Sequence, residues 1–334
     1  MDQSALKDRD HEWLDYYEQF HYFSAEAVRD GCHPRIMEHE EPAEKSIVLV
    51  HGLTDSPYFL TAIGDYLFKI LGYNVYLPLL HCHGLNEPNG MEGVELDEWK
   101  ANVNFAVEIA AAKSAKVSIG GLSTGGTLSF YTSVKNKKIN GTLYLFSAAL
   151  DLAGGIGGLV GELKERLLRT FMADVLDNDK PLIGVNPYRY SRMDMDGARE
   201  LSKMIKETDT LIKQFNPKEP FSKRVFAAHS ESDTTANITG IEDLQKVSVP
   251  DQFTFFRIPE DVGVSHASIV LKDPVYAIDA SDGDEPLEKA NPQFQDMMEA
   301  IAAIEWSGRN RPQANGIING SSDRTDRKPP TFGQ

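Results

Sequence analysis

The stretch from Val117 to Gly126 reads Val-Ser-Ile-Gly-Gly-Leu-Ser-Thr-Gly-Gly, an apolar run that enters Gly-x-Ser-x-Gly and then a helical pattern. A sharp strand-to-helix turn of this kind lifts the hydroxyl of Ser123 clear of the backbone. Glycines on both sides are needed because the turn leaves no room for Cβ atoms and strains the serine backbone. Gly-x-Ser-x-Gly also occurs by chance in many proteins, but this context predicts a nucleophilic serine rather than an incidental one.

A nucleophilic serine needs a base that takes its proton. Two histidines follow Ser123 in the chain, His229 and His266. His229 comes at the end of a predicted strand, whereas His266 lies in the loop after the last predicted strand. In a doubly wound sheet the partners of the nucleophile are expected on loops after later strands. We therefore expect His266 to be the base.

The base in turn needs an acid that orients its ring and stabilises the imidazolium. Asp233 follows the strand that leads into His229, and we expect it to accept a hydrogen bond from Nδ1 of His266. Glu231, two residues earlier, and Asp261, in the loop before His266, stay open as alternatives for the acid.

A tetrahedral intermediate also needs two preorganised N–H donors for its oxyanion. Thr124 directly follows the serine at a predicted helix N-terminus, so its amide is the first expected donor. The second is expected from the loop after the first core strand, His51-Gly52-Leu53-Thr54-Asp55, with the Leu53 amide as the first choice. Gly52 also suits a turn after a buried strand, and the two interpretations are compatible.

The elements that must position these residues alternate between strand and helix patterns. Strands are predicted at 46–50, 74–80, the run before Ser123, 142–146, 224–228 and 253–258, and helices at 57–71, from about 97, after Ser123, at 197–215 and at 292–306. Such alternation predicts an α/β fold with a mostly parallel, doubly wound sheet that is covered on both faces.

The chain divides into four regions by composition. The expected boundaries are an N-terminal helical extension with an aromatic stripe at 1–44, a core at 45–149 and 216–308, an inserted cap at 150–215 and a disordered, polar tail at 309–334. The cap begins with a glycine run at 154–161 that lacks the Gly-x-Gly-x-x-Gly spacing of a dinucleotide-binding loop.

Overall composition narrows the choice of partners and location. The net charge of −16 disfavours nucleic acid and anionic membrane surfaces. The two cysteines cannot form a disulfide framework, the N-terminus does not look like a signal peptide, and no apolar window is long enough for stable membrane insertion. We therefore expect a cytoplasmic protein, with a homodimer left open.

In these motifs the chain resembles the α/β-hydrolase superfamily, and within it the monoacylglycerol lipase, carboxylesterase and serine aminopeptidase-like group. The resemblance spans 45–305 and rests on the motifs His51-Gly52-Leu53-Thr54, His81-Cys82-His83-Gly84, Asp97-Glu98-Trp99, Gly121-Leu122-Ser123-Thr124-Gly125, Ser232-Asp233 and Ser265-His266. It implies an α/β-hydrolase fold with an inserted cap, the chain order Ser123, Asp233, His266, and esterase chemistry on a small-molecule acyl ester without a metal or organic cofactor.

The expected function is thus that of a serine carboxylester hydrolase that works through an acyl-enzyme. Apolar residues at 159–172 favour short- to medium-chain acyl esters or monoacylglycerols. A thioesterase or acyltransferase would use the same triad. An aminopeptidase would need an amine-binding site, for which the cap offers only Asp174, Asp177 and Asp179.

Two further alternatives belong to other classes. A ligand-binding receptor with this fold usually lacks one member of the triad, whereas all three are present here. His81, Cys82 and His83 could be joined by His51 in a metal site, but zinc needs its third or fourth ligand at fixed geometry, and we expect none.

Overall fold

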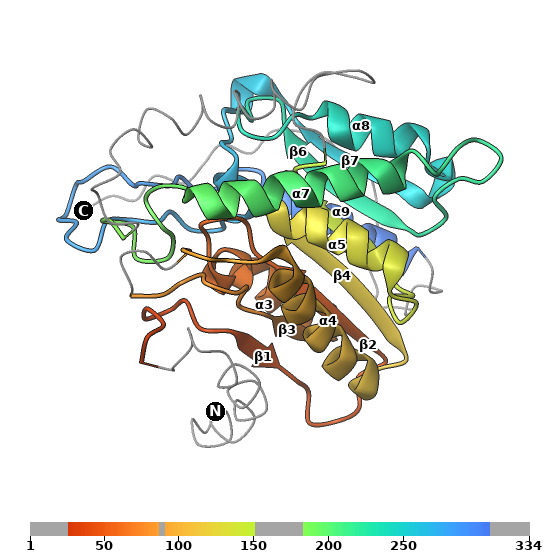
Figure 1. The fold of residues 1–334 in the computed structure, drawn as a ribbon, viewed down its shortest axis with the longest axis horizontal. Helices are drawn as coiled ribbons and strands as arrows, with labels where there is room; N and C mark the ends of the chain where they lie inside the picture. The colour runs from red at the N-terminus through yellow and green to blue at the C-terminus, as the bar shows by residue number, and fades with distance from the viewer. Residues whose placement is uncertain (1–25, 87–90, 151–182, 308–334) are drawn as a thin grey trace, which may run out of the picture.

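A computed structural model describes residues 26–86, 91–150 and 183–307. Its centre is a seven-stranded sheet in the order β1-β3-β2-β4-β5-β6-β7 (Figure 1). The strands are β1 (Arg35–Met37), β2 (Lys45–Val50), β3 (Tyr73–Leu77), β4 (Lys116–Leu122), β5 (Leu143–Phe146), β6 (Val225–Ser230) and β7 (Phe253–Ile258). All neighbours are parallel except β1, which pairs antiparallel with β3 at the edge.

Helices cover both faces of this sheet. They are α3 (Thr61–Lys69), α4 (Leu96–Lys113), α5 (Thr124–Lys135), α7 (Met195–Ile212), α8 (Thr239–Lys246) and α9 (Phe294–Trp306), with short 3-10 turns at η1 (Pro57–Leu60), η2 (Pro250–Gln252), η3 (Glu260–Val262) and η4 (Ala267–Val270). Figure 1 shows α5 and α7 in front of the sheet and α9 behind it.

Side-chain alternation along the strands creates two hydrophobic cores. In β2, Val48 and Val50 join the core under α4, α5, α7 and α8, while Ile47 and Leu49 join the one under α3 and α9. Successive side chains of a strand point to opposite faces, so a strand that is apolar throughout is buried on both sides. The predicted mostly parallel α/β sheet is therefore confirmed.

The predicted elements agree with the structure to within a few residues, with three differences. The strand predicted at 74–80 ends at Leu77, because Pro78 has no N–H to donate to the sheet. β1 and α8 were not predicted. The aromatic stripe near the N-terminus, the glycine run and acidic residues of the cap, and the tail lie wholly or mainly outside the described residues.

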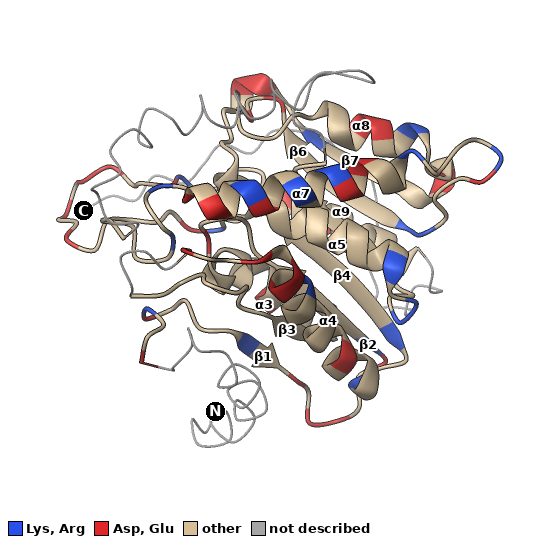
Figure 2. Ribbon diagram, viewed as in Figure 1, with Lys and Arg blue, Asp and Glu red and all other residues tan. Residues whose placement is uncertain are grey.

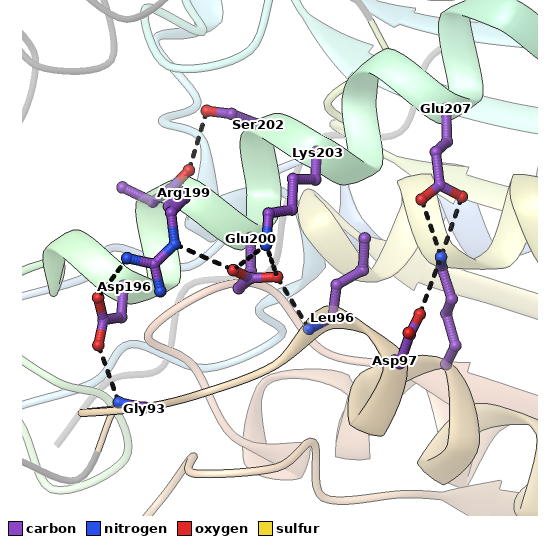
Figure 3. A network of polar contacts seen from close by, with 11 residues as sticks. Gly93, Leu96, Asp97, Asp196, Arg199, Glu200, Ser202, Lys203 and Glu207 are labelled. Carbon is purple, nitrogen blue, oxygen red and sulfur yellow. Dashed lines mark hydrogen bonds and ion pairs between the residues drawn. The ribbon is translucent and has the colours of Figure 1, made fainter.

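The start of α4 and the loop before it are joined to α7 by polar contacts (Figure 3). Asp196 Oδ2 accepts the Gly93 N–H at 2.8 Å, and Glu200 Oε2 accepts the Leu96 N–H at 3.1 Å. Figure 2 shows acidic and basic residues alternating along α7 but almost none on α5 beneath it. On α7, Arg199, Lys203 and Lys206 are exposed, whereas Glu200 is buried, and the helix covers one with little charge of its own.

A buried ion pair joins the first core strand to the last helix. Lys45 Nζ lies 3.0 Å from Glu305 Oε2, and the two side chains are 8% and 2% exposed. The hydroxyl of Tyr144 donates to Glu305 Oε1 at 2.8 Å. Burial opposes the charged carboxylate, but Lys45, Tyr73 and Lys116 together outweigh it and lower the pKa of Glu305 to about 2. The pair fixes the end of α9 against the sheet.

We predict that Glu305→Gln destabilises the fold by about 3–5 kcal/mol at neutral pH, because it removes the carboxylate that balances the buried charge of Lys45. The pKa of Glu305 is depressed on folding, so its contribution is present above its ordinary pKa of 4.5 and is lost as the pH falls toward 2. The free energies of unfolding of the parent protein and Glu305→Gln, measured in urea, should therefore converge as the pH falls.

A matched control is Asp209→Asn, which breaks the exposed pair with Lys213 on α7. Such pairs contribute about 0.5 kcal/mol or less. If Glu305→Gln and Asp209→Asn lowered the free energy of unfolding equally, the buried pair of Glu305 would contribute no more than an exposed one.

Candidate active site

Ser123 sits at the turn between β4 and α5 with a strained backbone. Its φ of 53° and ψ of −118° are unusual for a residue with a Cβ. The conformation is held by hydrogen bonds: the Ser123 N–H donates to Phe146 O at 3.0 Å, and its carbonyl accepts from the N–H of Thr127 at 3.1 Å. The serine is thus positioned by the neighbouring strand and by its own helix.

The turn is packed against the end of β2 so closely that it has no room for side chains. A Cβ on Gly125 would lie 1.9 Å from Val50 O and 2.4 Å from His51 O. A Cβ on Gly121 would lie 2.4 Å from Val50 O. These are backbone atoms of a buried strand, which cannot move aside. The glycines on both sides of Ser123 are therefore required by this contact.

His266 and Asp233 meet on the loops that follow β7 and β6. Nδ1 of His266 lies 2.7 Å from Asp233 Oδ2. The other carboxylate oxygen accepts the N–H groups of Thr235 at 2.8 Å and Ala236 at 3.0 Å. Burial opposes the charged form of Asp233, but His266, His229 and the Ala236 N–H together outweigh it, and the pKa of Asp233 falls to about 2.

The protonation state of this pair follows from the chemistry of the two groups. Asp233 is ionised near neutral pH and can only accept, so Nδ1 of His266 carries the proton. In the neutral ring Nε2 is then free to accept one. The imidazole has the tautomer that a general base requires.

His229 and Glu231 are held differently from His266 and Asp233. His229 is fully buried, its Nε2 lies 3.2 Å from Ala236 O and 3.6 Å from Asp233 Oδ2, and burial lowers its pKa. Glu231 pairs with Arg257 at 3.1 Å. Of the three acids, Asp233 is therefore the one whose carboxylate binds His266.

The loop after β2 runs beside the serine. A Cβ on Gly52 would lie 3.3 Å from the Ser123 Cβ. Within the described part of the chain, the Leu53 amide donates to no protein acceptor. The Thr124 amide begins α5, where N–H groups have no acceptor in their own helix. Thr124 thus directly follows Ser123, and Leu53 directly follows the glycine that approaches it.

His51 holds this loop as a neutral ring. Its Nε2 accepts the Leu80 N–H at 3.1 Å, so Nδ1 carries the proton and donates to Gly52 O at 2.9 Å. Burial lowers the pKa of His51 well below its usual range. His83 is also held by backbone, with Nδ1 2.8 Å from His81 O. Among the described residues, no group of histidine, cysteine and acidic side chains is arranged to hold a metal ion.

A charged cluster beside the loop, in which Asp55 is buried and Arg189 and Glu288 are partly buried, was not predicted. Asp55 Oδ1 lies 3.2 Å from Arg189 Nε, and Arg189 Nη1 lies 2.5 Å from Glu288 Oε1. Burial raises the pKa of Asp55, while Arg189 and His266 lower it. The acidic residue that directly follows His-Gly-Leu-Thr could have suggested a buried charge at Asp55. Its partners Arg189 and Glu288 could not be predicted, because no local sequence pattern joins residues so far apart in the chain.

A parallel sheet with helices on both faces and a strained serine at the turn from β4 to α5 define this protein as one with the α/β-hydrolase fold. Solved structures support this. A lipolytic enzyme from a study of the metagenome-derived LipS and LipT covers 84% of this chain and 99% of its own, with 15% identity and a TM-score of 0.59.

Two other solved structures are monoacylglycerol lipases. A soluble variant of the Saccharomyces cerevisiae enzyme, bound to a substrate analog, has 15% identity and a TM-score of 0.57 over 84% of this chain and 92% of its own. The Paleococcus ferrophilus enzyme has 15% identity and a TM-score of 0.51 over 82% of this chain and 98% of its own. At this identity the likeness establishes the fold.

The sequence itself is similar to a curated relative. It is 29% identical over 166 residues to a thermostable monoacylglycerol lipase of Bacillus sp. (strain H-257), a match that covers 48% of this chain and 62% of that lipase. No protein-family model matches the chain. In the described ranges, no helix has the length and apolar character needed to cross a bilayer.

We predict that Gly125→Ala yields little soluble, folded protein, because the added Cβ would meet the carbonyl oxygens of Val50 and His51. Gly64→Ala in α3 is the control, since its Cβ would meet the flexible end of Met37 at 2.9 Å. Soluble yield and circular dichroism measure the difference. A well-folded Gly125→Ala protein would show that the turn can move away from β2.

Proposed function

We propose that this protein is a serine carboxylester hydrolase that works through an acyl-enzyme, with Ser123 as nucleophile, His266 as base and Asp233 as acid. The observation that carries the proposal is the 2.7 Å contact between Nδ1 of His266 and Asp233. It leaves Nε2 as the acceptor in a site that also holds a strained, glycine-flanked serine.

The reaction follows from these positions in two halves. Ser123 Oγ attacks the ester carbonyl while Nε2 of His266 takes its proton, and the ionised Asp233 stabilises the imidazolium. The amides of Leu53 and Thr124 bind the oxyanion. His266 then protonates the departing alcohol, which leaves an acyl group on Ser123. Water, deprotonated by the same histidine, releases the acid and restores the serine.

The proposed substrates are short- to medium-chain acyl esters or monoacylglycerols. The similarity to the Bacillus monoacylglycerol lipase supports this choice, as does the fold shared with the yeast and Paleococcus enzymes. We also propose a cytoplasmic location, in keeping with two cysteines, Cys32 and Cys82, that are both buried and free.

We predict that Ser123→Ala lowers kcat for p-nitrophenyl butyrate by about 10⁴-fold or more, because no other group on the turn replaces the nucleophile. A series of esters from acetate to decanoate, and then monoacylglycerols, gives the chain-length preference, with the maximum expected at short to medium chains. Unchanged hydrolysis by the variant would overturn the mechanism.

Asp233→Asn is expected to lower kcat by roughly 10⁴-fold, because an amide can stabilise the wrong tautomer of His266. Glu231→Gln is the matched control: it lies in the same loop but pairs with Arg257, so its kcat should stay near that of the parent protein. If the two variants lost activity to the same degree, the acid would have to be reassigned.

A further inference from the structure

The segment 186–190, which we call the strap, lies just before α7 in the chain and contacts several loops near Ser123. Arg29 Nη1 donates to Asn186 O at 3.1 Å. The rings of Tyr188 and Tyr58 stack with centroids 3.4 Å apart. The strap is thus anchored at both of these points before it reaches the loop after β2.

Arg189 of the strap contacts that loop through two nitrogens of its planar guanidinium and Glu288 through the third. Nε pairs with Asp55 Oδ1 at 3.2 Å, Nη2 donates to Thr54 Oγ1 at 3.3 Å, and Nη1 pairs with Glu288 at 2.5 Å. A guanidinium presents its donors in a rigid fork, which an ammonium cannot reproduce. Glu288 holds the third nitrogen of the guanidinium and so helps to fix its orientation.

Tyr190, the next residue, extends the contact to a second loop. Its N–H donates to Thr54 O at 2.8 Å. Its hydroxyl donates to Cys82 O at 3.1 Å and accepts the Leu85 N–H at 3.0 Å. Arg189 and Tyr190 therefore hold both the loop after β2 and the loop that follows β3.

These two loops carry strained backbone at the residues that the strap binds. Among the described residues, the non-glycine positions with positive φ are Thr54 at 69°, Cys82 at 60°, Ser123 and Ser147. Positive φ is costly for a β-branched residue such as Thr54 and persists only where surrounding contacts enforce it. The strap supplies contacts to both Thr54 and Cys82.

We propose that Arg189 is a positioning residue for the oxyanion hole: by binding Thr54 and Asp55 it keeps the preceding amide, that of Leu53, directed at Ser123. This inference rests on the proposed function, in which that amide is a donor. Thr54 follows Leu53 directly, and its φ sets the orientation of the peptide that joins the two residues. A change in this strained angle would therefore displace Leu53 and, with it, the N–H of Leu53 one peptide earlier. A displacement of about 1 Å at such a site can cost about 10²-fold in rate.

Electrostatics supports the same role. Asp55 Oδ2 would lie 2.5 Å from a Cβ on Gly52, on the side of that glycine that also faces the Ser123 Cβ. An unpaired carboxylate there would oppose the negative charge that develops on the substrate. The charged groups that face Asp55 are Arg189, His266 and Glu288, and Arg189 is the permanent cation among them.

The test is Arg189→Lys in the full chain, which keeps the charge but loses the fork. We expect kcat for p-nitrophenyl butyrate to fall by about 10- to 10²-fold, a loss that approaches removal of one oxyanion donor, while KM changes little. The affinity for a trifluoromethyl ketone, whose adduct with the serine carries an oxyanion, should fall by the same factor.

Arg199→Lys on α7 is the matched control. Arg199 makes a comparable ion pair with Asp196 at 2.8 Å but is exposed and does not contact the loop after β2. Its kcat and ketone affinity should equal those of the parent protein. Parental kcat and ketone affinity in Arg189→Lys, or a change confined to KM, would overturn the proposal.

A second pair of variants covers the case in which Arg189→Lys does not fold. Thr54→Val removes the hydroxyl that Arg189 binds, and Thr54→Ser keeps it. Thr54→Val is expected to show the lower kcat and the weaker ketone binding. Equal values in the two variants would count against a role for the contact between Arg189 and the Thr54 hydroxyl.

Labelling of Ser123 by a fluorophosphonate separates this inference from the proposed function. An unlabelled, inactive parent protein refutes the proposed function and this inference with it. A labelled parent protein with unaffected variants refutes this inference alone.

Discussion

The contact on which the rest of this structure depends is the close approach of the start of α5 to the end of β2. Parallel pairing of β2 with β4 sets Val50 opposite Gly121, and Gly125 then lies against the carbonyl oxygens of Val50 and His51. Because no side chain fits between them, the turn that carries Ser123 and the loop that carries Leu53 share one surface. This backbone contact brings the loop of one candidate oxyanion donor, Leu53, against the turn that carries the other, Thr124.

Charged pairs lie at both ends of the strands. At the carboxyl ends of the strands, Asp233 binds His266 and Asp55 binds Arg189. At the amino ends, Lys45 binds Glu305 and has no part in the proposed chemistry. Each buried carboxylate therefore has a partner, as the cost of burying a charge requires. The first two pairs join loops that are distant in sequence, so they also fix how those loops meet around Ser123.

Most of the fold could be predicted because the core strands are short apolar runs bounded by turn residues. That pattern identified six of the seven strands, and their alternation with helices predicted the parallel sheet. β1 was missed because its three residues are only partly buried and pair at an edge. α8 was missed because its eight residues offer few apolar positions, of which Ile241 and Leu244 are buried.

The sequence by itself determined the strained turn at Ser123, the glycines that allow it and the order in which Ser123, Asp233 and His266 occur, because local composition restricts local backbone conformation. Only the tertiary structure decided that Asp233, and not Glu231, contacts His266, and that Arg189 holds Thr54 from 135 residues away. Such choices depend on how loops from different strands come together, and no local pattern encodes that arrangement. The reason is physical: periodicity reports the burial of a segment, whereas the partner of a charge depends on which loops the sheet brings within a few ångströms of it.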